Sequence, residues 1–83
     1  MKIIPLHADV LAYLRKHQLI RKWEKASRFF ESNIRHSSLN TELMEPHWRG
    51  VYSFRLDKKY RALFLIISPN EVEVIAVTNH YKK

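Results

Sequence analysis

The stretch from Tyr60 to Ile67, with the sequence YRALFLII, constrains the fold of this chain more than any other. Apart from Arg61, it is apolar on both of the faces that alternate along a strand, a pattern typical of a central strand covered on both sides. Val51–Leu56 and Val72–Thr78 are also strand-like. Ser68–Glu71 has the proline and asparagine of a tight turn. We therefore predict an antiparallel meander with Tyr60–Ile67 inside it.

The chain before about residue 36 has a helical pattern instead. One helix is predicted over about 7–18. A second is predicted over about 20–34, because its apolar residues are spaced three and four apart. Lys2–Pro5 fits a short edge strand, since proline removes a ladder donor, and Leu43–Met44 is expected to be a further strand. The predicted fold class is α+β, with two N-terminal helices packed on an antiparallel four-stranded sheet.

Length and composition indicate one small folded domain over residues 1–83, because 46% of the residues are hydrophobic. The chain has no cysteine, and its histidines lack metal-ligand spacing, so we expect no disulfide, no metal and no cofactor. No run of apolar residues resembles a signal peptide or a membrane span. The sequence therefore predicts a soluble, cytoplasmic protein without a membrane partner.

The formal net charge is +7. Such an excess of positive charge favours polyanions such as nucleic acid, although it also keeps a small protein soluble without binding anything. An acidic protein partner is a third interpretation. Candidate contacts for the phosphates of a polyanion include Lys58 and Lys59 between two predicted strands, and Lys82 and Lys83 at the C-terminus. Trp48 beside Arg49 is a candidate for stacking on a base, with simple packing as the alternative.

Two arginines flank the tripeptide Asp57-Lys58-Lys59. If the two strands pair around this tripeptide, Arg55 faces Arg61 across the ladder, where like charges destabilise a sheet. Two guanidinium groups a few ångströms apart suit a phosphate, which relieves their repulsion. The alternative is a loop of another length, which leaves the two arginines apart on a solvated surface.

The chain ends with Asn79-His80-Tyr81-Lys82-Lys83. The pKa of a histidine lies nearest neutrality among the side chains, which suits proton transfer. His80 follows a strand predicted to lie beside the strand of Arg61. A frayed C-terminal tail is the alternative.

Three segments together resemble one known family. They are Leu39 with Leu43, then GVYSFRLDKKYRALFLI, then VEVIAVTNHY. In this order they resemble the RelE/ParE superfamily of type II toxin–antitoxin toxins, and the likeness is strongest from about Ser38 to Tyr81. The resemblance implies two N-terminal helices against a twisted antiparallel sheet. It also implies an acidic antitoxin as partner.

The ending His80-Tyr81 is similar to that of the RelE/YoeB-like members, which cleave mRNA in the ribosome. The resemblance implies that Arg61 is the catalytic arginine, with Arg55 and Tyr81 beside it and His80 as general acid. YoeB-like members carry a catalytic glutamate ahead of the glycine. The resemblance implies that Glu45 or Glu42 is the general base here, and neither aligns with that glutamate without a gap. The substrate would be mRNA on the ribosome, and the nucleophile the 2′-OH of the RNA. The alternatives are a ParE-like inhibitor of DNA gyrase and an inactive relative.

Overall fold

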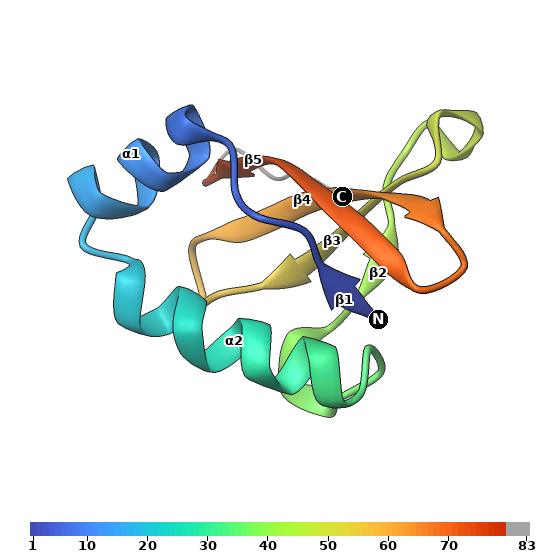
Figure 1. The fold of residues 1–83 in the computed structure, drawn as a ribbon, viewed down its shortest axis with the longest axis horizontal. Helices are drawn as coiled ribbons and strands as arrows, with labels where there is room; N and C mark the ends of the chain where they lie inside the picture. The colour runs from blue at the N-terminus through green and yellow to red at the C-terminus, as the bar shows by residue number, and fades with distance from the viewer. Residues whose placement is uncertain (80–83) are drawn as a thin grey trace.

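In the computed structural model, which describes residues 1–79, the long strand β4 (Arg61–Ser68) lies in the middle of a five-stranded sheet (Figure 1). It pairs antiparallel with β3 (Val51–Arg55) on one side and with β5 (Glu71–Thr78) on the other. The edge strands are short: β2 (Glu42–Leu43) beside β3, and β1 (Lys2–Ile3) beside β5. The predicted meander and its central strand are confirmed.

The α+β class is confirmed, but the prediction of a four-stranded, wholly antiparallel sheet is wrong. The fifth strand is β1, which runs parallel to β5 with Lys2 opposite Glu71 and Ile3 opposite Val72. The amide of Ile4 also donates to the carbonyl of Val72, at 3.0 Å. The short edge strand predicted at Lys2–Pro5 is thus present as Lys2–Ile3, but two residues do not reveal that the strand pairs in parallel with β5.

The helices are α1 (Ala8–Lys16) and α2 (Ile20–Ser32), and each ends slightly before its predicted end. Gln18 has a positive φ of 57°, which turns the chain out of α1, and Asn33 is extended, which ends α2. Two short 3₁₀ turns follow, η1 (Ser37–Leu39) and η2 (His47–Arg49). No helix among the described residues has the length and hydropathy needed to cross a membrane.

Three phenylalanines join the helices to the sheet. Phe30 of α2 stacks on Phe54 of β3 with ring centroids 4.8 Å apart and meets Phe64 of β4 edge-on at 5.1 Å. All three are fully buried. Trp23 covers Phe54 from α2 as well, at 5.9 Å. The helices therefore cover the face of β3 that carries Phe54, and Arg55 lies on the opposite face, because side chains alternate along a strand.

The far half of β4 is not covered as predicted. Ala62 and Phe64 are buried, but Ile66 and Ile67 are 46% and 47% exposed. The cover over β4 stops after Phe64, which the uniformly apolar sequence does not reveal.

The hairpin between β3 and β4 confirms the predicted register, with Arg55 directly opposite Arg61. Asp57 holds the turn: its Oδ1 accepts the amides of Lys59 at 2.8 Å and Tyr60 at 2.7 Å. Its Oδ2 accepts from Lys22 of α2 at 2.6 Å. One carboxylate therefore both closes the loop and ties it to a helix.

Asp57 makes the stability of the fold depend on pH. Burial disfavours the charged carboxylate, but the hydrogen bonds from Lys22, Tyr60 and Lys59 outweigh it and lower the pKa of Asp57 below its ordinary 3.8. A carboxyl group with a lowered pKa stabilises the fold above its unfolded pKa, and this contribution is lost as the pH falls through the folded pKa.

We expect Asp57→Asn to lower the free energy of unfolding by about 1–2 kcal/mol at pH 7, because a charged acceptor is lost. The difference from the parent should shrink as the pH falls below 3.8. Urea unfolding across this pH range measures it, with the exposed Glu24→Gln as control. A difference that stays constant with pH would contradict this account.

Candidate functional site

Beside the β3–β4 hairpin lies a small recess, here called the arginine recess, with a volume of about 150 Å³. Its lining combines both arginines of the hairpin with two lysines, two carboxylates and an amide: Asn40, Glu42, Arg55, Asp57, Lys58, Lys59 and Arg61. Four of these seven side chains are cationic. The structure thus brings together most of the charged residues that the sequence singled out around the hairpin.

The guanidinium of Arg61 is buried, with the residue only 6% exposed. Its Nε donates to the hydroxyl of Ser53 at 2.9 Å, and its Nη2 donates to the backbone carbonyl of Asn40 at 2.6 Å. A weaker bond of 3.4 Å runs from Nη2 to the carbonyl of Ser53. These acceptors fix the plane of the guanidinium before any ligand arrives, and such preorganisation is what charge stabilisation in a reaction requires.

The electrostatics around Arg61 combine three effects. Burial is the largest and lowers the pKa of Arg61, Glu42 opposes it, and Arg55 lowers it further. The arginine stays charged, because a guanidinium is not deprotonated near neutral pH. Arg55 itself is exposed. One cation is therefore held rigidly inside, and a second faces solvent directly opposite it.

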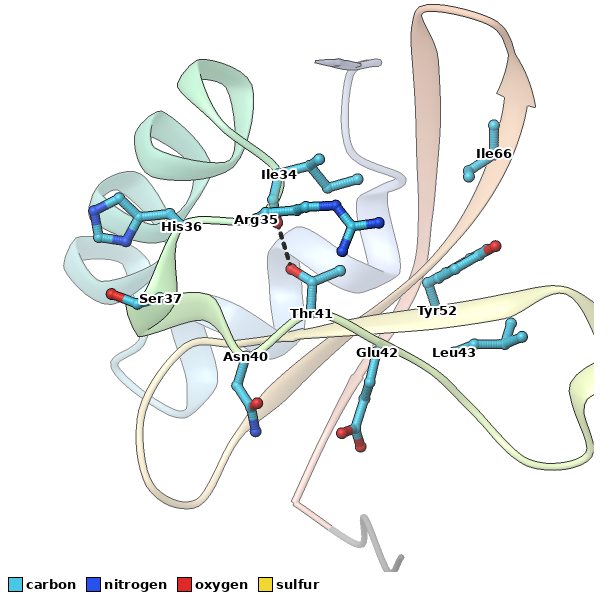
Figure 2. Close-up of a pocket in the computed structure, with 10 residues that line it drawn as sticks. All are labelled: Ile34, Arg35, His36, Ser37, Asn40, Thr41, Glu42, Leu43, Tyr52 and Ile66. Carbon is cyan, nitrogen blue, oxygen red and sulfur yellow. Dashed lines mark hydrogen bonds between the residues drawn. The ribbon is translucent and has the colours of Figure 1, made fainter.

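Of the two glutamates considered as a base, the structure brings Glu42 to the arginines. Strand β2 places Glu42 opposite Ser53, and Glu42 lines the recess. Figure 2 shows the Glu42 and Asn40 side chains pointing the same way, away from Arg35 and Tyr52. Glu45 lies beyond β2, before a cis Glu45–Pro46 bond, is exposed, and is not among the residues that line the recess.

Trp48 and Arg49 form a separate feature in η2, which precedes the start of β3, whereas Arg55 ends that strand. Trp48 is 82% exposed, with the guanidinium of Arg49 5.6 Å from its ring centroid. The packing alternative for Trp48 is thus wrong within residues 1–79. The structure does not bring this pair to the arginine recess.

The C-terminal candidates His80, Tyr81, Lys82 and Lys83 lie outside the described residues. The last strand, β5, ends at Thr78, which is directly opposite Arg61 in the ladder. No group of three or more metal-ligating side chains occurs within residues 1–79.

The sequence did not single out the groups that hold Arg61. Ser53 does carry a signal, since it is a hydroxyl between two aromatic residues of the strand, Tyr52 and Phe54. Asn40 contributes a backbone carbonyl from a left-handed conformation with a φ of 46°. The residue type does not show which backbone oxygen accepts a hydrogen bond, so the sequence could not have identified this acceptor.

The fold is one that toxin structures share. A YoeB/ParE toxin from Agrobacterium tumefaciens superimposes with a TM-score of 0.71 at 16% identity, covering 98% of this chain and 100% of that one. The YoeB–YefM toxin–antitoxin complex from Staphylococcus aureus gives 0.67 at 16% identity, over 96% and 94%. YafQ from E. coli strain BL21(DE3) gives 0.71 at 6% identity, over 95% and 90%.

The likeness lies in the fold and covers nearly the whole chain. The sequence matches no protein-family model and no curated protein. The architecture is therefore that of YoeB- and YafQ-type toxins.

The hydroxyl of Ser53 gives a test of how Arg61 is held. We expect Ser53→Ala to lower the free energy of unfolding by about 1–3 kcal/mol, because it removes one acceptor from a buried charged donor. Asn40→Gly is the matched control, since it keeps the backbone carbonyl and glycine adopts a positive φ freely. Urea denaturation of the two variants measures the difference. If Ser53→Ala and Asn40→Gly both kept the free energy of unfolding of the parent chain, the Ser53 hydroxyl would not be needed.

Proposed function

We propose that this chain is the toxin of a type II toxin–antitoxin module and acts as a ribosome-dependent mRNA endoribonuclease that inhibits translation. The observation that carries the proposal is the arginine recess, in which Glu42, Arg55 and Arg61 meet on a fold shared with YoeB and YafQ structures. A carboxylate beside two arginines has the charges needed to move a proton and to hold a phosphate.

The proposed reaction uses the 2′-OH of the RNA as nucleophile. Glu42 takes the proton of this hydroxyl, and the oxygen attacks the adjacent phosphorus. The bond to the 5′-oxygen of the next nucleotide breaks, and His80 protonates that oxygen. The products are a 2′,3′-cyclic phosphate and a 5′-hydroxyl, so water is not consumed in this step. No metal is required.

The arginines have distinct parts in this proposal. Arg61, held by Ser53 and Asn40, stabilises the charge that builds on the phosphoryl oxygens. Arg55 is exposed and binds the incoming phosphate. Lys58 and Lys59 line the same recess and add attraction for the RNA backbone. Tyr81 is proposed to act beside His80.

The remaining charge suits ribosomal RNA, since the whole chain has a net charge of +7. Trp48, Arg49, Lys82 and Lys83 are proposed as further RNA contacts. A ribosome that positions the message would supply much of the rate, which fits a catalytic set of so few groups. The proposed setting is the cytoplasm, and the proposed protein partner is an acidic antitoxin, as YefM accompanies YoeB in the Staphylococcus aureus complex.

One alternative has support of its own. The Agrobacterium neighbour is described as a YoeB/ParE toxin, and a ParE-like role would be the inhibition of DNA gyrase. Expression of the parent chain separates the two: primer extension on a reporter message in a translation extract detects cleavage, whereas a change in DNA supercoiling without cleavage supports gyrase. If expressing cells grow and show neither message cleavage nor a change in DNA supercoiling, both the nuclease and the gyrase hypotheses are refuted.

The general base is tested with two neighbouring glutamates. We expect Glu42→Gln to reduce message cleavage by about 100-fold or more, because glutamine cannot accept the proton of the 2′-OH. Glu45→Gln is the matched control and should cleave like the parent. Cleavage rates by primer extension, with ribosome binding measured in parallel, give the answer. If Glu45→Gln alone loses activity, Glu45 is the base instead.

The general acid is tested at His80. Glutamine keeps hydrogen-bonding groups but delivers no proton near neutral pH, so His80→Gln should lower cleavage by about 100-fold or more while ribosome affinity persists. Removal of Lys82 and Lys83 should instead weaken ribosome binding and reduce its dependence on salt. Undiminished cleavage by His80→Gln would remove this residue from the mechanism.

A further inference from the structure

The backbone carbonyl of Asn40, which accepts from Nη2 of Arg61 at 2.6 Å, belongs to the part of the chain between α2 and β2. Residues 33–41 are here called the connecting segment (Figure 2). Asn40 directly follows the turn η1 and has a left-handed conformation, with a φ of 46° and a ψ of 51°. The acceptor is a backbone atom, so whatever fixes the backbone of η1 also directs this oxygen at Arg61.

Side chains hold the connecting segment in shape, as in other compact surface loops. The carboxamide of Asn33 accepts a backbone amide of the segment at 3.0 Å, and the hydroxyl of Thr41 donates to a backbone carbonyl of the segment at 2.7 Å. His36 acts on η1 itself, because its Nδ1 accepts the amide of Ser38 at 3.2 Å. The hydroxyl of Ser38 lies 2.8 Å from the same nitrogen. His36 therefore caps the start of the turn that Asn40 ends.

His36 is also fixed from outside the connecting segment. Its ring stacks on Phe29 of α2, with ring centroids 4.1 Å apart and planes 5° apart. Phe29 directly precedes Phe30, which is fully buried against the sheet. Figure 2 shows the side chains of His36 and Arg35 extending to opposite sides of the segment. The imidazole thus joins the backbone of η1 to a helix that the core holds in place.

The acceptors around Arg61 come from two separate parts of the chain. Leu39, only 1% exposed, fixes the end of η1 in the core just before Asn40. Beyond Asn40, strand β2 sets Glu42 opposite Ser53, and the hydroxyl of Ser53 is a further acceptor for Arg61. The position of the Asn40 carbonyl relative to the Ser53 hydroxyl therefore depends on the conformation of η1.

We propose that His36 is a positioning residue for Arg61, because it caps η1 and so holds the Asn40 carbonyl against the guanidinium. His36 does not line the arginine recess, and it acts only through the backbone of the connecting segment. Its effect on cleavage rests on the proposed nuclease function. Its effect on the position of Arg61 does not.

The proposal fixes the place of the proton on the neutral ring of His36. Because Nδ1 accepts the amide of Ser38, the proton lies on Nε2. Nitrogen-15 spectra of the labelled parent chain in mildly alkaline solution distinguish the two tautomers, and this test needs no substitution that has to fold. A neutral ring with its proton on Nδ1 would overturn the proposal.

Two substitutions separate the cap from the stack. Asparagine keeps an oxygen that accepts the amide of Ser38 but has no ring to place on Phe29, whereas phenylalanine keeps the ring and has no acceptor. We expect His36→Phe to speed the hydrogen exchange of the Arg61 Nε–H about tenfold or more, the equivalent of one lost hydrogen bond. His36→Asn should exchange like the parent. Nuclear magnetic resonance measures both rates.

Cleavage gives a second readout that a merely structural role would not move in the same way. In the proposed reaction Arg61 stabilises charge that develops in the transition state, so a displaced Arg61 should lower kcat with little change in KM. We expect a loss of about tenfold or more in His36→Phe, and recovery in His36→Asn. A rise in KM with an unchanged kcat would contradict the positioning role.

His7→Phe is the matched control. Nε2 of His7 lies 2.6 Å from the carboxylate of Glu73, and neither residue lines the arginine recess. The substitution removes a histidine contact without touching the support of Arg61, and urea unfolding compares its stability with that of His36→Phe. The control should keep the exchange rate and kcat of the parent. Equal acceleration of exchange in the two variants would show general destabilisation and refute the proposal, as would unchanged exchange in His36→Phe or a defect in His36→Asn as large as in His36→Phe.

Failure of the nuclease and failure of the positioning role give different results. If His36→Phe speeds exchange at Arg61 but the parent cleaves no message, the proposed nuclease is refuted and the positioning role stands. If the parent cleaves and His36→Phe lowers kcat without any change at Arg61, the nuclease stands and the positioning role is refuted.

Discussion

The burial of the Arg61 guanidinium is the interaction on which the hairpin side of this molecule depends. An arginine directly opposite another arginine is unfavourable in a ladder, and burial makes the isolated charge costlier still. The structure offsets this with Ser53 and the Asn40 carbonyl as acceptors and with the nearby negative charge of Glu42. In the proposed function, the phosphate of the RNA would add negative charge between the two arginines.

The sequence predicted the features of the fold that depend on local patterns. The central strand followed from its apolar run, and pairing around the tripeptide Asp57-Lys58-Lys59 was one of the registers that the sequence left open. The errors concern distant parts. The edge strand expected at Lys2–Pro5 is present, but its parallel pairing with β5 was not foreseen, and the exposure of Ile66 depends on where the helical cover ends. Neither feature can be inferred from the local sequence of the residues concerned.

The same distinction applies to the site. The pairing of Arg55 with Arg61 was one of two alternatives, because a loop of another length would have kept them apart, and the structure has the paired register. The choice between Glu42 and Glu45 was not, since it depends on how β2 pairs with β3 and on which side of that strand each carboxylate points. Asn40 was beyond prediction, because the acceptor is its backbone oxygen in a left-handed conformation.

The segment from Asn40 to Glu42 lies between the arginine recess and a larger depression on the other side of β2, and both Asn40 and Glu42 line the two depressions. The same segment supplies the carbonyl that accepts from Arg61 and the carboxylate that lines the recess. Strand β2 has only two residues, so few hydrogen bonds of its own fix this segment. The geometry around Arg61 therefore depends on how β2 pairs with β3 as well as on the arginine itself.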